Sequence, residues 1–351
     1  MPRVVGIDAG TVSVDVCGLG DGHLSLDYSG PTAEALADPD AFIDGLRAAG
    51  KPDLVVAPSG YGLPVRPAGE ATDEDLRLAF LAGPGERGGI GGLRRLVQRL
   101  AASELPVVFT PGVMHLDTVP AHRKINRVDL GTADKVCATA LAIEEHRQRT
   151  GRRVEDISLI LLELGGAFTA AIAVDRGQIV DGLGGTSGPI GWRASGALDG
   201  EVALLAGTVD KGLLFGGGAE SVARSSPSGR ALAIAAYVEC AVKAVVQLRV
   251  SAPSADEVFV SGRGAEDRGL LERLHVALAG VGTVRRLEGF ALVAKHGAQG
   301  AALLADGLAG GRHEALVRRL RIREAQGTVL DHLHVITPAA ARRRLGLDAG
   351  N

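Results

Sequence analysis

Residues 6–13 read GIDAGTVS, the end of an apolar strand that closes on an acid and turns through glycine. Glycine lets the backbone approach a phosphate closely, and successive N–H groups around such a turn form an anion-binding nest. The pattern makes three residues candidates for holding a phosphate: Gly10, Thr11 and Ser13. Asp8 would hold Mg²⁺ beside it, because Mg²⁺ prefers oxygen ligands and keeps several waters. An ordinary hairpin turn is the alternative, since Asp and Gly are common turn residues.

The same arrangement returns at residues 162–169, which read LELGGAFT and occupy the matching place in the second half of the chain. Glu163 takes the position of the metal-binding acid, and the expected phosphate contacts are Gly165, Gly166 and Thr169. Two such turns facing across a cleft would grip a polyphosphate from both sides. Two occurrences at matched positions favour this interpretation over a pair of unrelated hairpins.

Around each motif the chain follows one order of elements: three strands joined by glycine turns, then helix, strand and helix. The order starts at Arg3 and again at Ile157. Although the two halves share little identity, a repeated order predicts an internal duplication. We therefore expect an α/β protein with two lobes, residues 1–150 and 151–310, and a ligand cleft between them. Residues 311–351 are expected to form a basic helical tail that packs on the lobes.

The apolar and turn patterns predict the individual elements. Strands are expected at 3–8, 12–18, 23–28, 53–57 and 106–110 in the first half, and at 157–164, 168–174, 178–182, 257–261 and 283–287 in the second. Helices are expected at 38–49, 93–102, 133–149, 230–250, 270–279 and 299–308.

Composition narrows the class of protein. The chain has 351 residues, of which 46% are hydrophobic, enough for about two domains with real cores. A net charge of −3 argues against nucleic acid as the main partner. Three scattered cysteines give no disulfide or zinc pattern, which together with a start lacking a secretory signal favours the cytoplasm. The apolar stretch 231–248 carries Glu239 and Lys243, so we expect a buried helix and no membrane partner.

A third motif follows the expected strand 257–261. Residues 258–266 read VFVSGRGAE, in which the strand breaks at glycine and enters a helix. Backbone without side chains at Gly262 and Gly264, next to Arg263, would allow an adenine ring to lie flat against the chain. A plain strand-to-helix loop is the alternative.

A fourth motif, GTADK at residues 131–135, opens a helix. Thr132 fits an N-cap, and Asp134 in the first turn is explained equally by the helix macrodipole. The functional interpretation is that Asp134 points into the cleft as general base for an acceptor hydroxyl. Lys135 beside it would then contact the substrate.

Two further stretches are candidates for binding. The loop 184–196 carries Arg193 and the only Trp of the chain, and loops of this composition often bind ligands. A long connection without a binding role is the alternative. The stretch 115–127 just before the GTADK helix is charged, and would supply an acceptor pocket for an anionic group. A solvated surface is the alternative there. The residues expected in that pocket are His122, Arg123 and Arg127.

Two glycine-rich stretches match known nucleotide-binding motifs only in part. Residues 45–51 match most of a Walker A motif, but Pro52 stands where Ser or Thr must bind Mg²⁺. Residues 83–88 match a dinucleotide-binding pattern, but no strand precedes them. Neither supports a P-loop or Rossmann fold.

The motifs together resemble those of the acetate and sugar kinase, Hsc70 and actin superfamily. DAGT at residues 8–11 resembles its first phosphate motif, residues 163–169 its second, and residues 260–264 its adenosine motif. The resemblance covers about residues 3–310. It implies duplicated ribonuclease H-like domains, as in actin-like ATPases, with a central nucleotide cleft and with ATP and Mg²⁺ as cofactors. The superfamily usually carries Asp where Glu163 stands, which makes direct metal contact there less expected.

Within the superfamily, residues 126–135, NRVDLGTADK, look like an uncharacterised family of predicted butyrate kinases. Residues 131–135 are also similar to type III pantothenate kinases, in which the Asp is the proposed base. LGG at 164–166, with Gly188-Pro189 and Arg193, is similar to butyrate and acetate kinases. The resemblance implies a catalytic role for Arg193 beside Asp8 and Asp134, and a possible homodimer.

The expected function is thus phosphoryl transfer from ATP to a small molecule. A carboxylate acceptor, with a pKa around 4–5, is ionised at neutral pH and needs no base. A hydroxyl acceptor gains from one, so the role of Asp134 decides between them. The competing class is an actin-like ATPase that acts as a conformational activator, or a sensor that binds a nucleotide or sugar without turnover.

Overall fold

The computed structural model describes residues 2–83 and 90–347. The chain packs into two compact units, and neither is continuous in sequence. Unit 1 combines Met1–Val128, Thr132–Glu144 and Gly289–Asn351, and unit 2 combines Asp129–Gly131 with Glu145–Glu288. The lobe boundaries expected from the sequence stay a prediction. Most of the glycine pattern at 83–88 lies outside the described residues.

Unit 1 is built on a five-stranded mixed sheet of order β3-β2-β1-β4-β5. β1 pairs antiparallel with β2 and parallel with β4. Asp21 and Gly22, both with positive φ, turn β2 into β3, as a tight two-residue hairpin requires. The strands are β1 (Arg3–Ala9), β2 (Ser13–Gly20), β3 (His23–Pro31), β4 (Leu54–Ala57) and β5 (Val107–Phe109).

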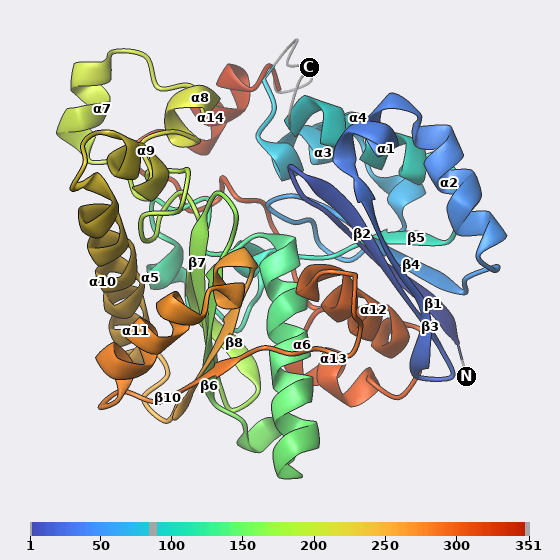
Figure 1. Ribbon diagram of the computed structural model, residues 1–351. Helices are drawn as coiled ribbons and strands as arrows, with labels where there is room; N and C mark the ends of the chain where they lie inside the picture. The colour runs from blue at the N-terminus through green and yellow to red at the C-terminus, as the bar shows by residue number, and fades with distance from the viewer. Residues whose placement is uncertain (1, 84–89, 348–351) are drawn as a thin grey trace. The chain divides into compact units, whose positions relative to one another are not determined.

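Helices cover both faces of this sheet, which explains why β1 is apolar on both sides. Figure 1 shows α1–α4 on one face and α12 on the other. Gly6 lets α12 approach closely, because a Cβ there would overlap the backbone of Ala298 and Ala302. The helices of unit 1 are α1 (Thr32–Ala37), α2 (Pro39–Ala48), α3 (Asp73–Phe80), α4 (Ile90–Ala101), α5 (Ala121–Lys124), α12 (His296–Leu308), α13 (Glu314–Leu320) and α14 (Pro338–Arg344). Helix α6 (Ala133–Thr150) begins in unit 1, and its residues from Glu145 onward belong to unit 2.

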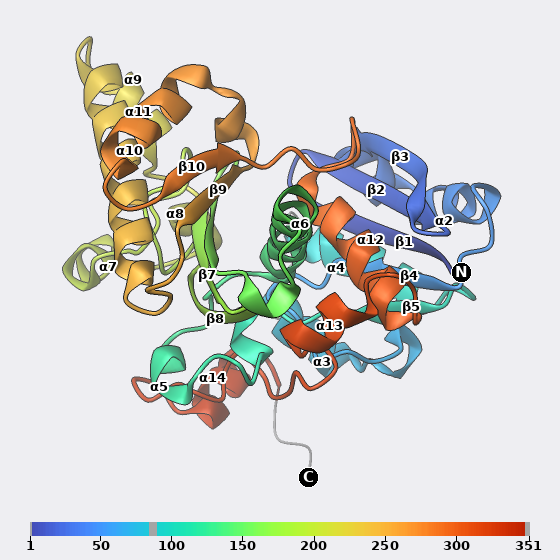
Figure 2. The ribbon, with the colours of Figure 1, turned by 90° about the horizontal axis from the view of Figure 1, so that it is seen from below.

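Unit 2 repeats the topology, with a sheet of order β10-β9-β6-β7-β8. Its second turn, Arg176-Gly177, again uses two residues with positive φ. Helices α10 and α11 lie along one face of the sheet (Figure 2). The strands are β6 (Leu159–Leu164), β7 (Thr169–Asp175), β8 (Gln178–Leu183), β9 (Glu257–Ser261) and β10 (Thr283–Arg286), and the helices are α7 (Gly200–Ala206), α8 (Lys211–Leu214), α9 (Ala219–Arg224), α10 (Gly229–Arg249) and α11 (Arg268–Leu278).

Helix α10 is the one helix of the described chain long and apolar enough to cross a membrane by length and composition, although such a helix is weak evidence for a span. It packs against the sheet of unit 2 through one face only. That face carries Ala233, Tyr237, Ala241 and Leu248.

The C-terminal segment packs on unit 1. Helix α13 lies against α12, and Gly307 gives it room. In α14, Arg342 forms an ion pair with Glu74 of α3. Upstream, the Asn126 side chain accepts hydrogen bonds from the backbone of His334, at 2.7 Å, and Val335.

Two α/β units, each with three antiparallel strands followed by crossover strands, confirm the fold class expected from the sequence. The ten strands fall where the patterns predicted them, within a few residues. Short helices such as α1, α3 and α7–α9 were not anticipated, because four to eight residues carry too little periodicity.

Candidate functional site

Asp8 stands near the end of β1, directly across from Asp15 of β2. The turn between the strands is fixed by hydrogen bonds: Gly10 N–H donates to Ser13 O at 2.9 Å, and Thr32 Oγ1 donates to Gly10 O at 2.7 Å. The Ser13 hydroxyl donates to Asp15 at 2.7 Å. Gly10 N–H and Ser13 Oγ are therefore engaged within the turn, so phosphate contacts there must draw on other groups as well.

Asp134 lies beside Asp8. It opens α6, and its carboxylate accepts hydrogen bonds from Thr132 Oγ1 and from Lys135 Nζ, the latter at 2.5 Å. Gly297 of α12 makes room for the pair, since a Cβ there would lie 2.6 Å from Asp8 Oδ2 and 3.4 Å from Asp134 Cβ. Three distant parts of the chain thus meet at one pair of acids.

The two carboxylates respond differently to their surroundings. Burial, together with the charge of Asp134, raises the pKa of Asp8 to about 7, against the opposing effect of Lys295 and Lys135. Burial also acts to raise the pKa of Asp134, but the charge and hydrogen bonds of Lys135 and Thr132 outweigh it and lower that pKa. Asp134 therefore holds the negative charge of the pair, and Asp8 takes up its proton near neutrality.

The acid pair suits a hard divalent cation. Within residues 2–83 and 90–347 no cluster of three or more His, Cys, Asp or Glu side chains is arranged to hold a metal. Mg²⁺ does not need one, because it commonly binds through one or two carboxylates and completes its shell with water and phosphate oxygens. A cation would also replace the proton that Asp8 otherwise needs, so the donor set fits Mg²⁺. Glu163, the second predicted metal residue, belongs to unit 2, and its metal role stays a prediction.

The second glycine turn, in unit 2, is shaped by close packing on one side. Gly165 lies against the chain, because a Cβ there would be 2.7 Å from Phe168 O, whereas Gly166 faces open space. Arg193 Nε donates to Gly166 O at 3.2 Å, and Arg193 N–H donates to Ala167 O. The structure thus brings the predicted Arg193 to the predicted turn.

Three other predicted residues of unit 2 have structural roles that the sequence did not indicate. Thr169 is fully buried at the start of β7, so its hydroxyl lies inside the unit. Gly262 and Gly264 are needed for packing, since a Cβ at either would come within 2.6 Å of Leu164. Gly262 also has a φ of 80°, which favours glycine. Packing and backbone conformation therefore explain the glycines at these two positions without an adenine ring. The side chain of Arg263 is exposed.

The predicted acceptor residues lie mainly at the surface. His122 and Arg127 are exposed, and Arg123 is half-buried. The buried members of that stretch are Lys124, whose Nζ donates to Leu116 O at 2.8 Å, and His115, whose pKa burial lowers to about 4. Among the predicted substrate residues, Lys135 is the one bonded to Asp134. The roles of the other three stay predictions.

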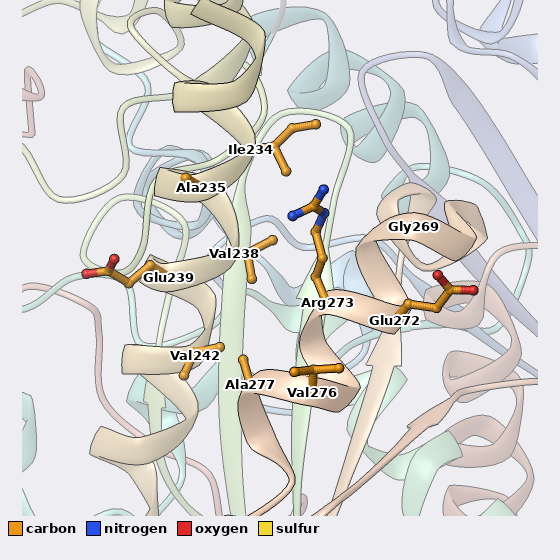
Figure 3. A pocket seen from close by; sticks show the side chains of 10 residues that line it. All are labelled: Ile234, Ala235, Val238, Glu239, Val242, Gly269, Glu272, Arg273, Val276 and Ala277. Carbon is orange, nitrogen blue, oxygen red and sulfur yellow. The ribbon is translucent and has the colours of Figure 1, made fainter.

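An apolar groove of about 580 Å³ lies between α10 and α11 of unit 2. Figure 3 shows aliphatic side chains from both helices along it, with the Arg273 side chain extending between the helices and Glu239 and Glu272 pointing outward on opposite sides. It has neither a glycine turn at a strand end nor a pair of facing carboxylates.

Three residues of these sites were missed by the sequence interpretation. Lys295 and Asp15 pair at 3.1 Å next to the first turn. Asp129 accepts hydrogen bonds from Thr186 N and Oγ1, at 3.0 and 3.1 Å, and so fixes the loop that leads to Arg193. The position of an acid within the strand 13–20 was a usable sequence signal for Asp15. Lys295 gave no such signal, because it lies 280 residues from Asp15 in the sequence.

Comparisons with known proteins agree with the fold. Residues 6–335 match a family model described as "Protein of unknown function (DUF1464)". No curated protein matches the sequence. A propionate kinase from Francisella tularensis is similar in structure, with a TM-score of 0.61, 13% identity, and 86% and 98% of the two chains covered. The acetate kinase of Entamoeba histolytica gives 0.57, 12%, and 80% and 87%, and that of Porphyromonas gingivalis 0.57, 13%, and 86% and 98%.

Proposed function

The chain belongs to the family of that description, and we propose that it transfers the γ-phosphoryl group of ATP to a small-molecule acceptor at the Asp8–Asp134 pair. The observation that carries the proposal is the meeting of two half-buried carboxylates at the Gly10 turn, flanked by Lys135 and Lys295. Phosphoryl transfer needs mainly positioning and charge neutralisation, and this arrangement supplies both. The fold, shared with acetate and propionate kinases, is consistent with it.

In the proposed site Asp8 and Asp134 hold Mg²⁺, which when bound neutralises charge on the phosphates. Lys135 keeps Asp134 anionic and oriented, through its 2.5 Å bond. Thr11, at the tip of the turn, lies next to the phosphate. In unit 2, Gly166 and Arg193 form a second phosphate-binding element, with adenosine bound near Arg263.

For the acceptor we propose a short carboxylate. A general base must take up a proton, but Asp134 is held anionic by a cation and two hydrogen bonds, which makes it a weak base. A carboxylate needs none: its oxygen bonds to the γ-phosphorus, the bond to the β,γ-bridging oxygen breaks, and ADP leaves with an acyl phosphate formed. The alternative is a hydroxyl acceptor, which requires Asp134 to accept the hydroxyl proton.

The test is ADP release with Mg·ATP and a panel of acetate, propionate, butyrate, pantothenate and simple sugars. Hydroxylamine traps an acyl phosphate as a hydroxamate, which separates a carboxylate acceptor from an alcohol. The proposal expects ADP and hydroxamate in equal amounts with one short acid. ADP release that no acceptor stimulates would favour an actin-like ATPase, and absence of nucleotide binding would contradict the proposal altogether.

A further inference from the structure

One lysine of unit 1, so far named only as flanking the acid pair, lies at the first glycine turn and has no ligand contact assigned to it. Lys295 immediately precedes α12, and its side chain does not cap that helix. Its Nζ lies 3.1 Å from Asp15 Oδ2 and 3.1 Å from the position that a Cβ on Gly10 would occupy. The ammonium group is therefore placed directly beside the turn.

The contrast in exposure shows which way this ammonium group faces. The Asp15 side chain is 1% exposed, whereas that of Lys295 is 46% exposed. An ammonium group has three N–H donors. Among the described residues, Asp15 is the one side chain that pairs with the Lys295 ammonium group. Donors therefore remain on the solvent side, next to Gly10.

The backbone around Lys295 is held unusually firmly for a connecting segment. Asp27 of β3 accepts N–H groups from Leu292 at 2.8 Å, Val293 at 3.1 Å and Ala294 at 2.7 Å. Asp15 accepts Lys295 N–H at 3.3 Å as well as its ammonium group. Two carboxylates of the hairpin thus fix the backbone of the segment, so that little backbone freedom is left to lose when Lys295 binds a ligand.

The charges around the Gly10 turn indicate a role for Lys295. Three carboxylates stand around the Gly10 turn, and Lys135 is committed to Asp134 at 2.5 Å. A polyphosphate entering this region would meet net negative charge unless another cation faced it. Lys295 is the cation placed to do so, and its charge also acts on Asp8.

We propose that Lys295 Nζ binds a phosphate oxygen of the nucleotide at the Gly10 turn, and that Asp15 and Asp27 serve to position it. The inference rests on the proposed function, because it takes the polyphosphate of ATP as the ligand. It assigns the phosphate contact to a side chain that arrives from the far end of the chain. The Gly10 N–H, already bonded to Ser13 O, is left to shape the turn.

The experiment measures the affinity of full-length protein for ATP, ADP and AMP by calorimetry, with and without Mg²⁺. Lys295→Gln keeps a donor for Asp15 but removes the charge, and Lys295→Met removes both. Loss of a hydrogen bond to a charged group should weaken ATP binding by roughly 10- to 100-fold. AMP affinity should change little, and Lys295→Arg should recover part of the ATP affinity.

Lys51→Met is the matched control, because Lys51 is an exposed lysine of the same unit. Melting temperatures separate binding from folding: Asp15→Asn should lower stability as much as Lys295→Met if the pair is merely structural. Wild-type ATP affinity in Lys295→Gln would overturn the inference and leave the proposed function intact. A wild-type protein that binds no ATP at all would overturn both.

Discussion

The glycine turns of the two units occupy the same place in the same topology, yet they differ in charge. The turn of unit 1 is surrounded by three acids and two lysines. The turn of unit 2 has Glu163 at its strand and Arg193 folded onto Gly166. A duplicated backbone therefore does not imply duplicated chemistry, since function depends on the side chains placed on it. In the proposed function this difference is the reason why metal binding and phosphoryl transfer are placed in unit 1, with a further nucleotide contact in unit 2.

The strongest test of this contrast exchanges the acid at each turn for its amide. Asp8→Asn should lower ATP turnover on the order of 10³-fold, because it removes a ligand of the cation that stabilises charge in the transition state. Glu163→Gln should cost roughly tenfold or less. Steady-state kinetics at saturating Mg·ATP compares the two variants. Equal losses of turnover would contradict the proposed difference in role between the two turns.

Asp134→Asn should lower kcat by roughly 10²-fold while leaving the KM for ATP within a few-fold. The variant loses the anion that Lys135 and Thr132 stabilise, but not the Gly10 turn. An unchanged kcat would return Asp134 to the role of an acid in the first turn of α6.

Replacing each of the two acids by its amide is expected to change stability in opposite directions. The pKa of Asp8 is about 7 in the folded protein and near 3.8 when unfolded, so between these values the folded state binds the extra proton. Stability therefore falls as pH rises through this range. In metal-free buffer at pH 8, Asp8→Asn should be more stable than wild type by roughly 2–4 kcal/mol.

At pH 4 the same variant should match wild type, and Asp134→Asn should be destabilised at pH 8, since it leaves Lys135 without its anion. Urea unfolding at the two pH values measures both effects. A stability gain for Asp8→Asn that is equal at pH 4 and pH 8 would show that Asp8 does not titrate between them.

The smallest expected effect concerns the turn of unit 2. Arg193→Met should weaken nucleotide binding by roughly three- to tenfold, because its guanidinium group is exposed and its charge is screened by solvent. Gly166→Ala should be tolerated, since its Cβ would enter open space. A loss of folding in Gly166→Ala would show that this turn is packed like Gly165, and would weaken its assignment as a binding turn.

The sequence predicted the fold well because its signals were local. A continuous apolar run located β1, alternation located β2, and glycine turns located the hairpins. The return of α12 to unit 1 was not visible, because it depends on Gly6 meeting Ala298 and Ala302, nearly 300 residues apart. Which sheet a helix covers is decided by such packing rather than by its own periodicity.

The candidate site was only partly predictable, for the same reason. Asp8 and Asp134 were singled out as candidates because each follows a recognisable local pattern. Lys295 was not, because its importance comes from Asp15 and Gly10 at the other end of the chain. Gly262 and Gly264 were assigned to a ligand although their missing side chains make room for Leu164.

The central claim, that the Asp8–Asp134 pair is the metal and phosphate site, is tested most directly by crystals grown with Mn²⁺ and a non-hydrolysable ATP analogue. Anomalous scattering locates the Mn²⁺ ion unambiguously. The account predicts the ion at the Asp8 carboxylate, directly or through one water within roughly 4 Å, with a phosphate oxygen at the Gly10 turn. A metal and phosphates bound elsewhere, such as along the groove between α10 and α11, would contradict it.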